Sequence, residues 1–367
     1  MGRVMEASSV RIFRSLYPLS FLYGCGVRVR NWLFDQGLLP SRRFPLPVIS
    51  VGNLAVGGTG KTPHTEYLIR LLRNDWQVAV LSRGYRRKSK GFVLASASAT
   101  AADIGDEPYQ MAHKFPDIYV AVDSDRCEGI DRLTDSRTAP GVEVILLDDA
   151  FQHRYVRPGL SLLLTDYHRP FFQDALLPAG RLREPVAGRR RAEVMVVTKC
   201  PPGLGEDDRQ RYLQALAPCP GQQVFFTTLV YGALQPLFTH RPERRLDTLG
   251  AEDHVLLLTG IAAPAPLRRE VARYTPHVVA VSFADHHDFS ASDLRRVEEA
   301  FHRLPEDRRI VVTTEKDASR LLGHAELSEA LKERLYVLPV EVDFLFHEKE
   351  RFNQYITAYV RENTRSR

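Results

Sequence analysis

The chain of 367 residues is long enough for two domains, and 44% of its residues are hydrophobic while 26% are charged. This composition is typical of a protein that buries a core, and it excludes the disordered and fibrous classes. A net charge of +5 is compatible with an anionic ligand or membrane surface but requires neither. Four cysteines without a CxxC pair indicate no zinc site and no disulfide framework, so we expect reduced thiols in a cytosolic protein.

The N-terminal segment SLYPLSFLYGCGV, residues 15–27, resembles the apolar part of an export signal. We expect no export, because a nucleotide-binding loop further along the chain needs cytosolic ATP. The run is also shorter than the about 20 apolar residues that span a bilayer. Two interpretations remain, an amphipathic helix that covers part of the core and an interfacial membrane anchor. Pro18 is expected to kink or interrupt this helix. Helical spacing places four of its apolar residues on one face: Ile12, Leu16, Leu19 and Tyr23.

Short apolar runs then alternate with helical patterns. Strands are expected over 46–52, 78–84, 118–123, 142–149, 160–166 and 192–199, and helices over 61–74, 106–115 and 125–136. Near-continuous apolar strands joined by helices predict a doubly wound parallel sheet.

Residues 55–62, AVGGTGKT, lie between the first strand and the first of these helices. The common phosphate-binding pattern is G-x-x-x-x-G-K-[ST], and Gly60-Lys61-Thr62 fits it, although Ala55 replaces the first glycine. The chemistry tolerates this change, because glycines inside the loop let backbone N–H groups approach phosphate oxygens. A chance glycine-rich turn is the alternative, and the flanking strand and helix favour a nucleotide site. The expected phosphate-binding residues are Ala55, Val56, Gly57, Gly58, Thr59, Gly60, Lys61 and Thr62, with Thr62 also directed to Mg²⁺.

Further motifs contain candidate catalytic and binding groups. The strand VILLDD ends in Asp148 and Asp149. This is the acidic position that holds Mg²⁺ in phosphate-loop enzymes, and the alternative is that the two aspartates form an ordinary helix cap or turn. Asp106 in IGDEP precedes a helix, where the alternative is N-capping. FADHHDF, residues 283–289, suits proton handling better than metal binding, or is a polar turn. Arg181 and Arg183 in LPAGRLREP are suited to a substrate phosphate, or belong to a solvated loop.

A second α/β series completes the chain. Strands are expected over 222–234, 254–261, 277–283 and 308–317, followed by an extended run over 335–344 and a helix over 347–363. The expected parts are a membrane-associating helical segment over 1–35, a phosphate-loop core over 36–220, a smaller α/β domain over 221–344 with linker strands at both ends, and a C-terminal helix over 345–367 that packs on the core.

Eight motifs in this order together resemble the tetraacyldisaccharide 4'-kinase family, the lipid A 4'-kinases of Gram-negative bacteria. They are GGTGKTP, SRGY, GDEP, DDAFQHR, LPAGRLREP, TGIAAP, DHH and TTEKD. The resemblance implies a P-loop NTPase-like fold. It also implies transfer of the ATP γ-phosphate to the 4'-hydroxyl of tetraacyldisaccharide 1-phosphate, giving lipid IVA. The implied setting is peripheral association with the cytoplasmic face of the inner membrane, with no nucleic acid as partner.

The resemblance also implies roles for individual residues. Asp106 would be the general base, and His286 beside Asp285 would assist it from the second domain, after closure of the two domains. Lys61 would stabilise the transferring phosphoryl group. The implied Mg²⁺ residues are Thr62, Asp148 or Asp149, and Glu184, and the implied substrate residues are Gln152, His153, Arg181 and Arg183. Glu315, Lys316 and Asp317 receive no role.

Two departures from the family pattern are Arg86 in SRGYRR and Ala150 in DDAFQH, each in place of a glycine. Two rival classes share the loop. One is a nucleotide-dependent switch or metallochaperone, against which the lack of a CxxC or histidine-rich tract argues. The other is a kinase or ligase for a soluble small molecule, which would not need the N-terminal apolar segment.

Overall fold

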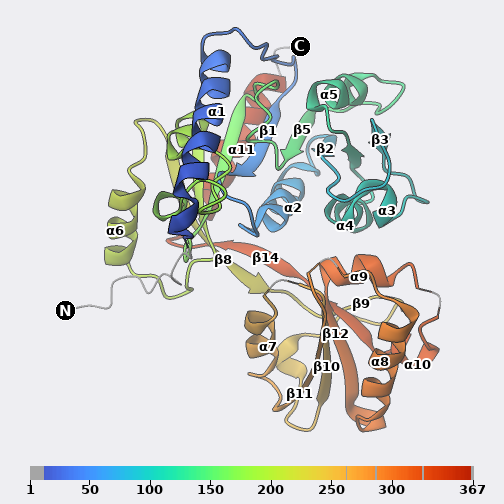
Figure 1. The fold of residues 1–367 in the computed structure, drawn as a ribbon. Helices are drawn as coiled ribbons and strands as arrows, with labels where there is room; N and C mark the ends of the chain where they lie inside the picture. The colour runs from blue at the N-terminus through green and yellow to red at the C-terminus, as the bar shows by residue number, and fades with distance from the viewer. Residues whose placement is uncertain (1–11, 262, 286, 325, 365–367) are drawn as a thin grey trace. The chain divides into compact units, whose positions relative to one another are not determined.

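The computed structural model describes residues 12–261, 263–285, 287–324 and 326–364, and these form two compact units (Figure 1). Unit 1 contains the chain up to Ala97, Lys114–Leu229 and the chain from Val342 onward. Unit 2 contains Ser98–His113 and Val230–Glu341. The sequence-based limits assign residues 98–113 to the core, whereas their contacts group them with unit 2.

Unit 1 is built on a nine-stranded sheet of order β14-β8-β7-β6-β1-β5-β2-β4-β3. All pairs from β8 to β4 are parallel, and β3 runs antiparallel to β4. The strands are β1 (Val48–Asn53), β2 (Val78–Ser82), β3 (Val93–Leu94), β4 (Tyr119–Val122), β5 (Val144–Asp148), β6 (Leu160–Asp166), β7 (Val194–Thr198), β8 (Gln223–Tyr231) and β14 (Val340–Phe344). The predicted doubly wound parallel sheet is therefore confirmed.

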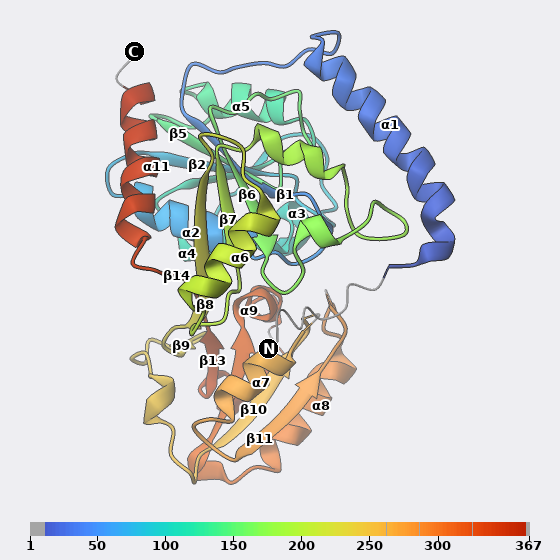
Figure 2. The ribbon, with the colours of Figure 1, turned by 90° about the vertical axis from the view of Figure 1, so that its left-hand side faces the viewer.

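Helices cover both faces of this sheet. Neighbouring residues of a strand point to opposite faces, so the contacts of two adjacent residues show what covers each face. On β8, Phe225 meets Phe352 of one helix at 5.1 Å between ring centroids, and Phe226 meets Tyr212 of another at 5.8 Å. Figure 2 shows α2 and α11 on one side and α6 on the other. The helices of unit 1 are α1 (Tyr17–Asp35), α2 (Lys61–Leu72), α5 (Arg126–Thr134), α6 (Glu206–Leu216) and α11 (Lys349–Thr364).

Helix α1 differs from its sequence-based description in two ways. Pro18 lies in the first helical turn, where no N–H partner is needed, so it starts the helix rather than kinking it. Leu19 and Tyr23 are both exposed, at 54% and 36%, and the Tyr23 hydroxyl donates to the Arg183 carbonyl at 2.6 Å. The other two residues of the expected apolar face, Ile12 and Leu16, lie before the start of α1 at Tyr17. Ser20, Gly24 and Phe34 form the buried face instead.

Unit 2 contains a five-stranded sheet of order β11-β10-β12-β13-β9, parallel except for β9 against β13. Its strands are β9 (Gln235–Pro236), β10 (His254–Thr259), β11 (His277–Ser282), β12 (Arg309–Thr314) and β13 (Leu335–Leu338). Its helices are α3 (Ala101–Ile104), α4 (Asp106–Lys114, except its last residue), α7 (Ala265–Val271), α8 (Ala291–His302), α9 (Glu315–Leu321) and α10 (Glu329–Lys332). The extended run predicted over 335–344 is interrupted at Pro339, so β13 joins this sheet and β14 the larger one.

We expect Phe352→Ala to lower the free energy of unfolding of unit 1 by about 3–5 kcal/mol, because it leaves a cavity among packed rings. Phe352 is 2% exposed and lies 4.7 Å from Phe344 between ring centroids. Urea denaturation followed by tryptophan fluorescence measures this, since Trp32 and Trp76 both lie in unit 1. Gln354→Ala on the exposed side of the same helix is the control, and an equal effect of the two changes would contradict the packing described.

Candidate active site

The phosphate loop follows β1 and leads into α2. Gly57 and Gly60 have φ of 116° and 82°, a backbone conformation that favours glycine. Thr59 is fixed from two sides, because Asn53 Nδ2 donates to its hydroxyl at 2.9 Å and the Thr198 hydroxyl donates to its carbonyl at 2.9 Å. Ala55 pairs with Leu182 in an antiparallel bridge, and Val56 N donates to the Arg181 carbonyl at 2.8 Å. The first position of the loop is thus extended and needs no glycine, which explains the deviant Ala55.

His64, in the first turn of α2, ties this loop to the sheet. Its Nδ1 lies 2.7 Å from the Gly60 carbonyl and its Nε2 lies 3.0 Å from the Thr227 hydroxyl on β8. Burial lowers the pKa of His64 to about 4, so the ring is neutral near pH 7. A neutral ring satisfies both partners when Nδ1 donates to Gly60 and Nε2 accepts from Thr227.

The predicted Lys61, Asp149, Gln152, Arg183 and Glu184 are brought together in one chain of polar contacts. Lys61 Nζ lies 3.6 Å from Asp149 Oδ1, and Arg183 donates to both Asp149 oxygens at 3.0 Å. Arg183 also donates to Gln152 Oε1 at 3.3 Å, and Gln152 donates to Glu184 at 2.9 Å. Burial acts to raise the pKa of Asp149, but Lys61, Arg183 and Arg126 outweigh it and hold the pKa below its ordinary value.

Asp148 is 1% exposed at the end of β5 and accepts a hydrogen bond from the Ser82 hydroxyl at 3.1 Å. The buried Arg126 at the start of α5 contributes to the electrostatics here. Burial lowers the pKa of Arg126 to about 10, while Asp148 and Asp149 oppose that shift. Sequence reasoning missed Arg126, because no pattern separates an arginine in a first helical turn from a surface residue.

Lys199 was also missed. Its ammonium donates to the Gly58 carbonyl inside the loop and pairs with Asp166 at 2.8 Å. Asp166 is the last residue of β6 and Lys199 directly follows β7, and both strands lie on the same side of β1. Parallel strands place their carboxyl ends at one edge, so a charged residue ending each predicted strand was the available signal.

Two predicted substrate residues lie outside this chain of contacts. His153 lies beside Asp125 and Cys127, with one potential ligand atom from each within 4.8 Å of the others. Burial, reinforced by Arg126, lowers the pKa of His153 to about 4. The Arg181 backbone N–H donates to Asp174 at 3.1 Å, and its guanidinium lies beside Gly57 of the phosphate loop.

The oxygen donors near the loop fit a magnesium ion. Thr62 offers a hydroxyl in the first turn of α2, and Asp148 and Asp149 offer carboxylates at the end of β5. Hard oxygen ligands of this kind suit Mg²⁺. Glu184 is 2% exposed and pairs with Arg191 at 2.8 Å, and a Cβ at Gly188 would lie 2.6 Å from Glu184 Oε2. Arg191 and Gly188 therefore fix the position of Glu184.

The predicted proton-handling residues lie in unit 2. Gly105, with φ of 90°, separates α3 from α4 and makes Asp106 the first residue of α4. Asp106 pairs with Arg320 at 2.5 Å, and Asp285 pairs with Lys316 at 2.9 Å. His286 lies outside the described residues. The expectation that Asp106 belongs to a different domain from the DHH motif is corrected, because Asp106 and Asp285 belong to the same unit.

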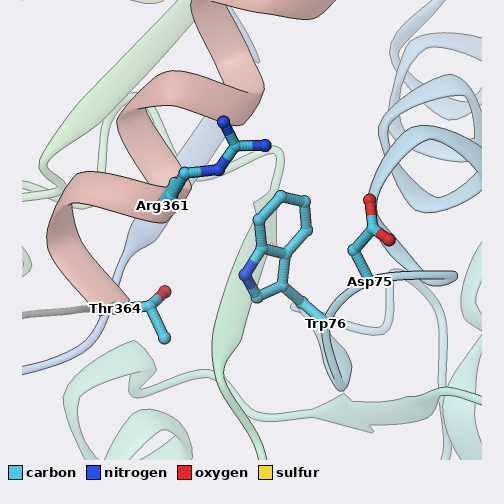
Figure 3. A pocket seen from close by; sticks show the side chains of 4 residues that line it. All are labelled: Asp75, Trp76, Arg361 and Thr364. Carbon is cyan, nitrogen blue, oxygen red and sulfur yellow. The ribbon is translucent and has the colours of Figure 1, made fainter.

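A pocket elsewhere in unit 1 is unrelated to this chemistry. It is lined by Asp75, Trp76, Arg361 and Thr364, and the Trp76 ring lies between Arg361 and Asp75 (Figure 3). It adjoins the carboxyl end of α2, whereas the phosphate loop precedes the amino end of this 12-residue helix. A helix of that length separates the two by roughly 18 Å.

A doubly wound sheet, a glycine-rich loop that begins a helix, and paired aspartates on a neighbouring strand define a nucleotide-binding protein of the P-loop class. The model of the tetraacyldisaccharide-1-phosphate 4'-kinase family matches residues 12–361, and the chain belongs to this family.

Relatives in other organisms agree along almost the whole chain. The tetraacyldisaccharide 4'-kinase of Phocaeicola vulgatus is 54% identical and covers 99% of both chains. That of Porphyromonas gingivalis is 44% identical over 93% of this chain and 96% of its own. A crystal structure of LpxK from Aquifex aeolicus in complex with ATP is 33% identical, with a TM-score of 0.72 over 95% of this chain and 99% of that one.

We expect the stability of unit 1 to fall as the pH drops from about 6.5 to about 4, through the buried His64. The unfolded chain binds a proton in this window and the folded chain does not, so the free energy of unfolding decreases by up to about 3 kcal/mol. Urea denaturation near pH 7.5 and about pH 5 measures the difference.

His64→Gln removes the titrating ring and should weaken this pH dependence. His302→Gln changes a histidine that is 55% exposed in unit 2 and serves as the control. An unchanged pH dependence in His64→Gln would show that the ring does not stay neutral in the folded state.

Proposed function

We propose that this protein is a lipid kinase that transfers the γ-phosphate of ATP to the 4'-hydroxyl of tetraacyldisaccharide 1-phosphate, giving lipid IVA. The observation that carries the proposal is family membership over residues 12–361, together with a complete phosphate loop whose lysine faces Asp149. The structural relative from Aquifex aeolicus was solved with ATP, which supports ATP as the phosphoryl donor.

The reaction needs a base because a sugar hydroxyl is a weak acid. In the proposed step the 4'-oxygen forms a bond to the γ-phosphorus and its proton passes to the Asp106 carboxylate. The bond between the γ-phosphorus and the bridging oxygen breaks, and ADP leaves with the electron pair. His286 and Asp285 would assist Asp106. The proposed base belongs to unit 2 and the phosphate loop to unit 1.

Unit 1 would hold and neutralise the nucleotide. The backbone N–H groups of residues 55–60 would bind phosphate oxygens, and Lys61 would leave Asp149 to contact the γ-phosphate. Thr62, with Asp148 or Asp149 and Glu184, would hold Mg²⁺, which would offset the negative charge of the phosphates. Arg183 and Gln152, which are hydrogen-bonded to each other, would contact the acceptor. Arg181 and His153 would contact the acceptor at its periphery.

We also propose that α1 places the enzyme on the cytoplasmic face of the inner membrane, where an acylated acceptor resides. Five large apolar side chains point away from the buried face of α1, and each is more than half exposed: Leu19, Phe21, Leu22, Val29 and Trp32. Two arginines are also exposed, Arg14 just before the start of α1 and Arg28 within the helix. Anionic lipid headgroups would attract both. Among the described residues, no helix is long and apolar enough to cross a bilayer.

Activity is tested by transfer of radiolabelled γ-phosphate to tetraacyldisaccharide 1-phosphate in detergent micelles. We expect Asp106→Asn to lower kcat by roughly 10²–10⁴-fold while ATP binding persists, because a general base contributes on that order. Lys61→Ala should instead impair ATP binding and transfer together.

The outcomes separate the hypotheses. Transfer that survives in Asp106→Asn would remove Asp106 as the base and leave the kinase intact. A wild-type protein that hydrolyses ATP but labels no lipid would favour a nucleotide-dependent switch.

Membrane association is tested by co-sedimentation with vesicles containing phosphatidylglycerol. The combined variant Phe21→Ser, Leu22→Ser and Trp32→Ser should bind at least about tenfold more weakly, since each side chain buries apolar area in the interface. Val279→Ser, a change at an exposed apolar residue of unit 2, should bind like wild type. Equal binding of all three proteins would contradict the role of α1.

A further inference from the structure

Four motifs of unit 2 meet in one network of charged groups. They are GDEP with Asp106, TGIAAP with Gly260, DHH with Asp285, and TTEKDASR with Lys316, Asp317 and Arg320. The last of these has no role in the proposed reaction so far. All the residues of the network belong to unit 2, and α9 contributes three of them.

Asp317 is the fixed centre of the network. It is 0% exposed, and its Oδ2 accepts from Gly260 N at 2.9 Å and from the Thr314 hydroxyl at 2.7 Å. A Cβ at Gly260 would lie 2.8 Å from Asp317 Oδ1, so the close approach requires glycine. Burial raises the pKa of Asp317, while the Gly260 N–H, Thr314 and Arg320 favour its charged form.

Arg320 joins this centre to the proposed base. Its side chain is 5% exposed, with one terminal nitrogen 3.2 Å from Asp317 Oδ1 and the other 2.5 Å from Asp106 Oδ2. The planar guanidinium offers donors in a fixed fork, so two carboxylates bound to one arginine are held in a defined mutual orientation. Asp106 and Arg320 lie 214 positions apart in the sequence, so the ion pair is a tertiary contact that fixes the start of α4.

The location of this pair argues against a merely stabilising role. A buried ion pair contributes little net stability, because desolvation of the charges offsets their attraction. Asp106 is also the residue for which the reaction needs a charged carboxylate in one orientation. Lys316, one turn earlier on α9, pairs with Asp285 at 2.9 Å, so the same helix contacts both described acidic candidates.

We infer that Arg320 is a positioning residue for Asp106. Its guanidinium fixes the orientation of the carboxylate and keeps it charged until the acceptor hydroxyl gives up its proton, and Asp317 holds the guanidinium in place. The inference rests on the proposed function, because it requires Asp106 to be the base. It assigns the TTEKDASR segment to the acceptor half of the reaction rather than to nucleotide binding.

The test measures kcat and the KM for ATP in Arg320→Gln, Arg320→Lys and Asp106→Asn, with folded protein quantified by circular dichroism. Arg320→Gln should lower kcat by at least about tenfold with the KM for ATP changed less than about twofold, since the loss affects the orientation of the base in the chemical step and not ATP binding. Arg320→Lys should recover part of the rate because it restores the charge without the fork.

The decisive measurement is the double variant. If Arg320 acts through Asp106, adding Arg320→Gln to Asp106→Asn should change kcat by less than about twofold, because coupled residues are not additive. Arg309→Gln is the matched control, because Arg309 is a buried arginine of the same unit, with 7% of the whole residue exposed against 8% of the whole residue for Arg320. Its partners are the backbone carbonyls of Phe301 and Leu304, so its kcat per folded enzyme should equal wild type.

Three results would overturn the inference. They are an unchanged kcat in Arg320→Gln, a full additional loss in the double variant, and an equal loss of kcat in Arg309→Gln. If Asp106→Asn itself retains full transfer, the base assignment in the proposed function fails, and this result is distinguishable because it needs no change at Arg320.

Discussion

The central position of β1 in the large sheet is the constraint on which the nucleotide half of the site depends. β1 lies between β5 and β6, with Val51 opposite both Asp148 and Leu162. This register brings the phosphate loop level with Asp148 and Asp149 on one side and with Asp166 on the other. A slip by one residue would move every side chain of β1 to the opposite face of the sheet. Because β1, β5 and β6 are buried on both faces, such a slip would disrupt the packing on each side.

The negative charges of the two candidate functional carboxylates, Asp149 and Asp106, are each balanced by basic side chains. Asp149 is held by Lys61 and Arg183 in unit 1, and Asp106 by Arg320 in unit 2. In each case the cation is itself fixed by a second group, Gln152 for Arg183 and Asp317 for Arg320. Such support keeps side chains in one geometry before the ligand arrives, which lowers the cost of ordering them during the reaction.

Much of the fold could be predicted from the sequence, because apolar runs with helices between them specify a parallel sheet almost regardless of detail. The phosphate loop was equally readable, since Gly60, Lys61 and Thr62 are adjacent in sequence. The grouping of residues 98–113 with unit 2 could not be predicted, because it rests on contacts between segments far apart in the sequence. One of them, between Asp106 and Arg320, joins residues 214 positions apart and leaves no local pattern. The break at Pro339 was not predicted either. β13 is continuously apolar whereas β14 alternates with Glu341 and Asp343, but both patterns suit a strand, and neither says which sheet the strand joins.

Helix α1 is hydrogen-bonded to segments of the candidate active site on one face and exposes apolar side chains on the other. The Ser20 hydroxyl donates to the Leu176 carbonyl at 3.0 Å and accepts from Ala179 N at 2.9 Å, Tyr23 binds the Arg183 carbonyl, and Arg30 binds the Gln152 carbonyl at 3.2 Å. Truncation of the N-terminus would therefore remove supports of the Arg183 loop together with any membrane affinity. A shortened enzyme that lost activity would say nothing about the bilayer, and only changes confined to the outward side chains keep the two effects apart. The same bonds couple the orientation of α1 to the backbone at Gln152 and Arg183, so any tilt of the helix would pull on both carbonyls.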